Sequence, residues 1–237
     1  MQRQTKRDPA SAKADDQAKK NAAVNVKEGL RELQKESGGD QQCIDFNYMV
    51  FTYGKFHNNF VNQFIHVVFV PIISYTFYAQ FAAVLPFYEL PYTIPLLGST
   101  FSLAIMPYIM LALAYFIVDV PTAAVHMAWS ATVVVFAHNE WVSHRTESYF
   151  GFSQLAFMMM VNAASWIAQF IGHGCFEQRA PAIGTNLTFA LLAPFFITFE
   201  TMNRGFGYRT GPKMNRLRYL IDMEIEEYHA ARSSKAN

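Results

Sequence analysis

The chain has 237 residues, of which 52% are hydrophobic and 16% are charged, whereas charged residues make up about 25% of an average soluble domain. The charge is also unevenly distributed, because residues 56–203 hold only 2 of the 19 Lys and Arg and 6 of the 18 Asp and Glu. So few charged side chains cannot give a stretch of that length a water-exposed surface. Composition therefore excludes a soluble single domain and an intrinsically disordered chain. The net charge of +1 gives no indication of a nucleic-acid partner.

The predicted elements follow from the apolar stretches. Residues 1–44 form a charged tail that we expect to be disordered apart from a short helix over 24–36. The apolar stretches lie at about 60–85, 95–120, 122–138, 153–172 and 187–203. A helix needs about 20 apolar residues to cross a bilayer, and the first, second and fourth stretches are that long. The tight connection at 118–121 predicts that the second and third stretches form a helical hairpin.

The last stretch and the C-terminal region are predicted to differ from these spans. The fifth stretch has 17 residues and contains Pro194 and Glu200, so we expect a broken, re-entrant or interfacial element. Apolar residues at helical spacing over 217–231 predict a short amphipathic helix.

These elements predict an all-α, polytopic transmembrane helical bundle of about four spans plus one short re-entrant or interfacial helix. Lys and Arg are concentrated at both ends of the chain, so the positive-inside rule predicts that both termini are cytosolic. The expected organisation is a disordered tail over 1–44, a membrane domain over 45–205 and a cytosolic tail over 206–237.

The first cluster of polar residues lies at the start of the apolar region and contains Tyr53, His57, Asn62 and His66. Ionisable groups at membrane depth are costly and are candidates for function. His57 and His66 are nine positions apart, so one straight helix would place them on opposite faces. They converge only if the backbone breaks between them. The Asn58-Asn59 pair is a plausible break, with a new helix starting near residue 60.

The second cluster follows the fourth apolar stretch and contains His173, Glu177 and Arg179. His173 and Glu177 are four positions apart, which places them on one face of a continued helix. Gly172 and Gly174 flank the histidine and allow another backbone to approach it. Imidazole and carboxylate groups suit iron or manganese, and the residues alone do not distinguish the two metals. A single buried histidine is more often a hydrogen-bonded polar residue than a ligand, but two such clusters at corresponding ends of apolar segments favour a shared site.

The remaining histidines give weaker signals. His126, His138 and His144 are expected to be structural or interfacial, and His229 is expected to be solvated. The sequence contains no HExxH, GxSxG or nucleotide-binding motif. It also lacks the HxxxH and HxxHH boxes of the membrane fatty acid desaturases and hydroxylases.

The two clusters resemble the 2-hydroxy fatty acid dioxygenases of the fungal endoplasmic reticulum and their relatives. The pattern Tyr-x3-His-x4-Asn-x3-His-x4-Pro of that family is filled from Tyr53 to Pro71, and its Trp-Ile-x-Gln-Phe-x-Gly-His-Gly pattern begins at Trp166 and continues to Ala182. The resemblance spans about 45–205. It implies an Fe(II)-dependent α-oxidation in phytosphingosine breakdown, in which a 2-hydroxy fatty acid reacts with O2 and loses its carboxyl carbon.

The resemblance also implies roles for individual residues. The implied metal ligands are His57, His66 and His173. Glu177 would be a further carboxylate ligand or a hydrogen-bonding partner of the ligands, and Arg179 or Lys55 would pair with the substrate carboxylate. Tyr53 and Asn62 would orient the imidazoles. The acyl chain would lie between the apolar helices, in contact with membrane lipid, and the chain length of the substrate stays open.

Two other classes of function compete with this reading. A non-enzymatic lipid-binding or scaffold protein of the endoplasmic reticulum membrane would use its histidines structurally, and its two clusters would lie far apart. A small transporter is disfavoured because no internal repeat is found. Geometry discriminates between the first two readings: the three metal-site imidazoles of an enzyme should come within roughly 4–5 Å of a common point.

Overall fold

The computed structural model of the protein describes residues 25–33, 35, 46–180 and 187–236. The chain divides into two compact units, one made of residues 1–55 and 209–237 and the other of residues 56–208. Each unit is described by itself.

The first unit is helical in its described part. Residues 25–33 and 35 are helical, as the sequence predicts for 24–36, and are followed by α2 (Phe46–Gly54) and α8 (Pro212–Ala236). The residues predicted to form a short helix, 217–231, are helical, and α8 is longer than expected. One face of α8 buries Met214, Leu217, Leu220 and Ile221. A Cβ atom on Gly54 would lie 2.6 Å from Ile221 Cδ1, so the glycine allows α2 to approach α8 closely.

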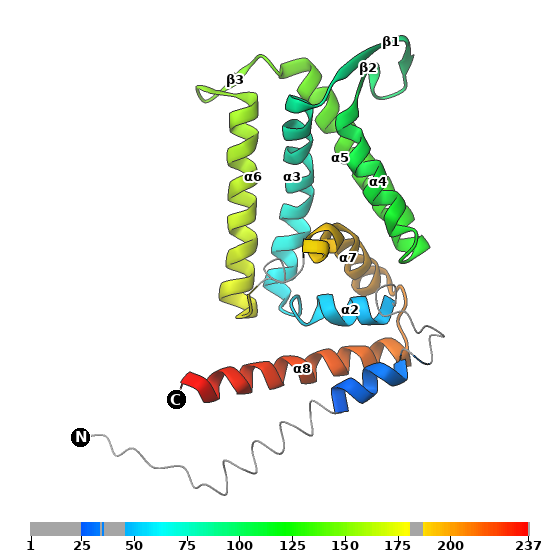
Figure 1. Ribbon diagram of the computed structural model, residues 1–237, viewed down its shortest axis with the longest axis vertical. Helices are drawn as coiled ribbons and strands as arrows, with labels where there is room; N and C mark the ends of the chain where they lie inside the picture. Colours follow the sequence, from blue (N-terminus) through cyan, green and yellow to red (C-terminus); the bar gives the residue numbers. More distant parts are fainter. Residues whose placement is uncertain (1–24, 34, 36–45, 181–186, 237) are drawn as a thin grey trace, which may run out of the picture. The chain divides into compact units, whose positions relative to one another are not determined.

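The second unit is built on three long apolar helices that pack side by side (Figure 1). They are α3 (Phe60–Val84), α5 (Val120–His144) and α6 (Gln154–Ile171), which continues into the turn η2 (Gly172–Glu177). All three are long and apolar enough to cross a membrane. The predicted all-α helical bundle is therefore confirmed.

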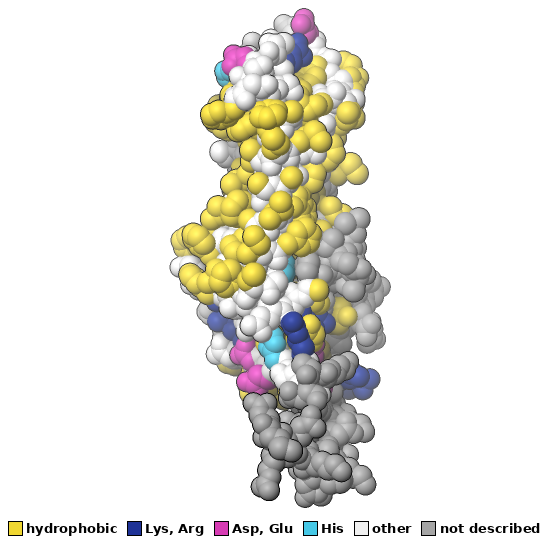
Figure 2. All heavy atoms as spheres, turned by 90° about the vertical axis from the view of Figure 1, so that its left-hand side faces the viewer, with side chains coloured by type: hydrophobic (Ala, Val, Ile, Leu, Met, Phe, Trp, Pro, Cys, Tyr) yellow, Lys and Arg dark blue, Asp and Glu magenta, His cyan; other side chains and the backbone are white. Residues whose placement is uncertain are grey.

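The surface of these helices is apolar over most of its length. In the apolar 18-residue segment of each of these helices, only 28–33% of the residues are buried inside the protein. Hydrophobic side chains cover the middle of the face that α6 presents, and charged side chains gather at its upper end (Figure 2). Large apolar residues such as Phe64, Phe136 and Ile167 are about 60% exposed, which suits contact with hydrocarbon rather than water.

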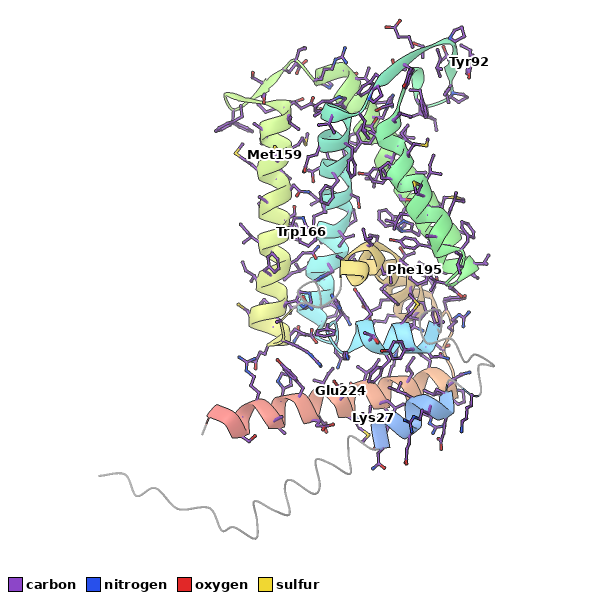
Figure 3. All side chains as sticks on the ribbon, viewed as in Figure 1. Lys27, Tyr92, Met159, Trp166, Phe195 and Glu224 are labelled. Carbon is purple, nitrogen blue, oxygen red and sulfur yellow. The ribbon has the colours of Figure 1, made fainter. Side chains whose placement is uncertain are left out.

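The second apolar stretch differs from its prediction as a full-length span. Residues 87–102 form an antiparallel hairpin of β1 (Phe87–Ile94) and β2 (Gly98–Ser102), whose tip carries Tyr92 (Figure 3). Pro91 and Pro95 cannot donate the backbone hydrogen bonds of a helix interior. The helical part is therefore limited to the short turn η1 (Leu103–Ile105) and α4 (Met106–Tyr115), which are too short to cross a bilayer at full thickness.

The connection between α4 and α5 forms the expected helical hairpin. The side chain of Asp119 caps α5 by accepting a hydrogen bond from Thr122 N at 3.2 Å, and Tyr208 donates to the same carboxylate at 3.0 Å. Helix α5 continues to His144, and a small hairpin of β3 (Ser148–Tyr149) and β4 (Phe152–Ser153) leads into α6.

The fifth apolar stretch is the 20-residue helix α7 (Leu187–Phe206), which contains Pro194. The proline lacks an N–H group and leaves carbonyl groups of the preceding turn without their helical partners. The Tyr115 hydroxyl donates a hydrogen bond to the Leu191 carbonyl. Phe195 follows the proline, is fully buried and packs its ring 5.3 Å from that of Tyr115 (Figure 3). These contacts attach α7 to α4.

The hydrophobic core lies between α3, α5 and α6 at the end that carries the β1–β2 hairpin. Its buried members are Tyr78, Ala79, Ala82, Ala104, Ile105, Val134, Ala137, Trp141 and Met158. Polar contacts also join the helices, such as the hydrogen bond that Asn162 Nδ2 of α6 donates to Thr76 Oγ1 of α3 at 2.8 Å.

Candidate metal centre

His57 and His66 converge because the backbone breaks between them. Helix α3 starts at Phe60, and the side chain of its N-cap residue Asn59 accepts a hydrogen bond from Val61 N at 2.9 Å. His57 lies in the bend before this cap. Its carbonyl accepts a hydrogen bond from Gln63 Nε2 at 2.5 Å, which fixes the bend against the first turn of α3. The predicted break at Asn58-Asn59 is confirmed.

His173 lies in the turn η2, where the α-helical pattern of α6 widens into a π-helix. Such turns are frequent at functional sites. Gly172 allows this turn to come close to α3, because a Cβ atom at position 172 would lie 2.4 Å from Asn62 Oδ1. The close approach brings His173 next to the other two histidines.

The three imidazoles form one buried group. Their ring centroids lie 4.6 Å apart for His57 and His66, 4.7 Å for His57 and His173, and 5.0 Å for His66 and His173. The rings are nearly perpendicular to one another, at 78–88°. One nitrogen from each ring lies within 4.8 Å of those of the other two. The geometry therefore agrees with the convergence expected of a metal-binding enzyme.

The hydrogen bonds of the rings leave nitrogen lone pairs for a ligand. His66 Nδ1 donates to the Asn62 carbonyl at 2.9 Å, so a neutral His66 has its lone pair on Nε2. This Nε2 faces His57 Nε2 at 3.3 Å. Two imidazole nitrogens on one ion with bonds of about 2.1 Å lie about 3.0–3.4 Å apart at angles near 90–109°. His173 Nδ1 is buried and has no hydrogen-bond partner within the described part of the chain. The donor set thus fits a divalent transition metal.

Glu177 holds the backbone on which His57 and His66 stand. Its two carboxylate oxygens accept hydrogen bonds from Asn58 N at 2.9 Å and from Asn59 N at 3.0 Å. Asn62 Nδ2 donates to the same carboxylate at 3.1 Å. A carboxylate at this position also interacts favourably with the positive end of the α3 dipole. Glu177 therefore contacts the bend that carries His57, and Asn62 contacts His66, while the roles predicted for both residues toward a metal stay predictions.

The sequence also predicts site roles for Arg179, Tyr53 and Lys55. Arg179 is half-buried and stacks its guanidinium 4.4 Å above the ring of Phe56. Tyr53 and Lys55 belong to the first compact unit, where Tyr53 is buried in α2. Their predicted roles stay predictions.

The remaining histidines of this unit lie on α5, where His126 lines a cavity together with the three imidazoles. His138 is buried near the β1–β2 hairpin, and its Nδ1 lies 2.6 Å from the Tyr78 hydroxyl. His144 lies at the end of α5 with its Nδ1 3.3 Å from Glu140. His126 is buried in α5 with its ring 4.7 Å from that of Tyr115.

A cavity of about 690 Å³ extends from the three imidazoles into the bundle. One wall follows a single face of α3, from His66 through Val70, Ser74 and Phe77 to Phe81. Other apolar wall residues, from α4, α6 and α7, are Met110, Leu111, Ala114, Trp166, Leu191 and Pro194. The volume is typical of pockets that enclose a small organic ligand.

The sequence patterns pointed to the imidazoles but not to this cavity. The wall residues on α3 recur at three- and four-residue spacing, which is the signal of one helix face. The same spacing also describes an ordinary packed core. Gln169, which precedes His173 by four positions, lines the cavity as well. In the sequence it belongs to the motif that begins at Trp166, but the motif alone gave it no role.

Comparisons with known proteins show the family of the chain. Residues 43–205 match the family described as 2-hydroxy-palmitic acid dioxygenase Mpo1-like. The 2-hydroxy-palmitic acid dioxygenase MPO1 of Saccharomyces cerevisiae is 26% identical over 185 residues, which cover 77% of this chain and 91% of the yeast protein. No solved structure matches the chain significantly. The matched region includes all three converging histidines and the cavity, and the chain belongs to the Mpo1-like family.

Proposed function

We propose that this chain is an Fe(II)-dependent membrane dioxygenase that converts long-chain 2-hydroxy fatty acids into fatty acids one carbon shorter. The observation that carries the proposal is the position of His57, His66 and His173 at one end of an apolar cavity. These three residues would hold the metal. When bound, the metal would supply the redox chemistry that activates O2 toward the substrate.

The cavity supports a long acyl chain as the apolar part of the substrate. The wall runs along α3 from His66 to Phe81, and these fifteen residue-to-residue steps correspond to about 22 Å of helix. A lipid acyl chain in one leaflet spans about half of the ~30 Å hydrocarbon core. The cavity is therefore long enough for such a chain, with the acid group beside the imidazoles. The relative's printed substrate, 2-hydroxy-palmitic acid, fits this description.

The surroundings of the imidazoles support a role in metal binding. Glu177 and Asn62 hold the backbone and the ring of His66 through direct hydrogen bonds. Removal of groups that orient metal ligands in this way commonly weakens metal binding 10- to 100-fold. The apolar walls keep bulk water away from the reacting group.

We propose the membrane of the endoplasmic reticulum as the location, with both termini and the end of the bundle that carries the imidazoles on the cytosolic side. The three long apolar helices support embedding in a membrane. The concentration of Lys and Arg at both ends of the chain supports the orientation.

Conversion of 2-hydroxy-palmitic acid by the detergent-purified protein tests the proposal. We expect the fifteen-carbon acid in the presence of air and Fe(II), no product without O2, and no product from His57→Ala, His66→Ala or His173→Ala. The surface variant His144→Ala is the matched control and should keep its activity. A protein that binds fatty acids with intact triad geometry but forms no product would instead be a non-enzymatic lipid-binding protein.

A further inference from the structure

The cavity contains few groups that can bind the acid end of a fatty acid. An ionised carboxylate that leaves water needs hydrogen-bond donors or a cation in its new place. Among the described residues of 56–208, no Lys or Arg lines the cavity. Arg179, which the sequence suggests for this task, lies over the Phe56 ring. A metal held by the imidazoles would supply only part of the required contacts.

Gln169 provides a neutral donor at the correct end of the cavity. It lines the cavity together with the three imidazoles and is only 6% exposed. It lies on α6 four positions before His173, and both side chains line the cavity. Its Nε2 atom is buried and has no hydrogen-bond partner within the described part of the chain.

Other buried amide groups of this unit use their donors. Asn162 Nδ2 donates to Thr76 Oγ1 at 2.8 Å, and Gln63 Nε2 donates to the His57 carbonyl. Asn62 Nδ2 donates to Glu177 at 3.1 Å. Buried polar groups are nearly always hydrogen-bonded, so a buried donor without a partner calls for a specific explanation. A ligand that supplies an acceptor inside the cavity explains the unpaired amide of Gln169.

We propose that the side-chain amide of Gln169 donates a hydrogen bond to a carboxylate oxygen of the fatty acid substrate. The inference rests on the proposed function, because it takes a long-chain acid as the ligand of this cavity. A hydrogen bond from a neutral donor to a charged acceptor is stronger than one between neutral groups. Gln169 is therefore a substrate-binding residue that holds the acid group beside the imidazoles.

Equilibrium binding of two ligands to the metal-loaded, detergent-purified protein tests this role. Palmitic acid carries the carboxylate, and 1-hexadecanol has the same chain without it; neither ligand has a 2-hydroxyl group. We expect Gln169→Met to bind palmitic acid about 10- to 100-fold more weakly and to bind 1-hexadecanol within about twofold of the unchanged protein. Gln169→Glu should weaken palmitic acid binding further, because two carboxylates would repel each other.

Ser165→Ala is the matched control. Ser165 is buried one turn before Gln169 on the same helix, but its hydroxyl bonds the Val161 carbonyl of its own helix. This variant should bind both ligands normally. Gln169→Asn is a second test variant that keeps the amide but withdraws it by one methylene group, and it should also lose affinity for the acid.

Two results would overturn the inference. One is unchanged binding of palmitic acid in both Gln169→Met and Gln169→Glu. The other is equal weakening of the acid and the alcohol, which would mean that Gln169 only shapes the cavity. The measurement needs no turnover, so a protein that passes it but forms no shortened acid would contradict the proposed reaction and leave the role of Gln169 standing.

Discussion

The Nε2 atoms of His57 and His66 face each other at 3.3 Å, although nine positions separate the two residues. The break at Asn58-Asn59 makes this contact possible, and the carboxylate of Glu177 holds both asparagine N–H groups. The end of α6 therefore does two things: it supplies His173, and it fixes the bend that brings the other two imidazoles together.

The close approach of η2 to α3 predicts different effects for two neighbouring glycines. A Cβ atom at position 172 would lie 2.4 Å from Asn62 Oδ1, whereas one at position 174 would meet nothing within 4 Å. We expect Gly172→Ala to lower the free energy of unfolding by about 1–3 kcal/mol and to weaken metal binding. Gly174→Ala should change the free energy of unfolding by at most about 0.5 kcal/mol. Thermal unfolding and metal titration of the two variants check this, and equal effects would contradict the account of the site.

Replacement of Glu177 by Gln tests the support of the bend. The carboxylate of Glu177 accepts one hydrogen bond from each of two backbone N–H groups, one on each oxygen. The amide of glutamine has only one acceptor oxygen, so its NH2 group would face the other N–H group. We expect Glu177→Gln to weaken metal binding 10- to 100-fold and to lower the free energy of unfolding by about 1–3 kcal/mol. The exposed carboxylate Glu147 gives the control variant Glu147→Gln, which should behave like the unchanged protein. Normal metal affinity in Glu177→Gln would argue against its positioning role.

The wall of α3 predicts residues that set the length of the acyl chain. Ser74 lines the cavity midway between His66 and Phe81, which is the last wall residue on this helix. Ser74→Phe should restrict turnover to shorter 2-hydroxy acids, and Phe81→Ala should improve turnover of longer ones, with the metal content unchanged in both. Phe64 is 59% exposed on α3, so Phe64→Ala is the control. A chain-length profile that none of the variants alters would show that the acyl chain lies elsewhere.

The exposed thiol of Cys175 offers a test of orientation. Cys175 lies in η2 at the same end of the bundle as the imidazoles. In sealed endoplasmic reticulum vesicles that carry the Cys43→Ser protein, a membrane-impermeant maleimide added outside should label Cys175. A cysteine introduced at the opposite end, as Glu147→Cys in a Cys43→Ser, Cys175→Ser background, should be labelled only after permeabilisation. The reverse pattern would contradict the proposed topology.

Local sequence signals predicted the parts of the site that depend on local backbone structure. The Asn58-Asn59 pair predicted the break that brings His57 and His66 together, and the structure shows that Asn59 also caps α3. The close approach at Gly172 could be expected from a residue without a Cβ atom beside a histidine. Both features are confirmed by the distances.

The features that depend on long-range packing could not be predicted in this way. The stretch 95–120 is mostly apolar, so composition alone favoured a full-length span, but its residues 98–102 form β2, which pairs with β1. The widening of α6 into η2 leaves no clear sequence pattern. The unpaired amide of Gln169 becomes visible only when α3, α4, α5, α6 and α7 surround a common cavity.

Metal analysis of the purified protein tests the central claim most directly. The account predicts about one iron per chain after purification with Fe(II), and loss of that iron in each of His57→Ala, His66→Ala and His173→Ala. His144→Ala, whose imidazole lies beside Glu140 at the end of α5, should retain it. Iron that stays bound in the three variants, or an unchanged protein that binds no divalent metal, would contradict the claim that these imidazoles form a metal centre.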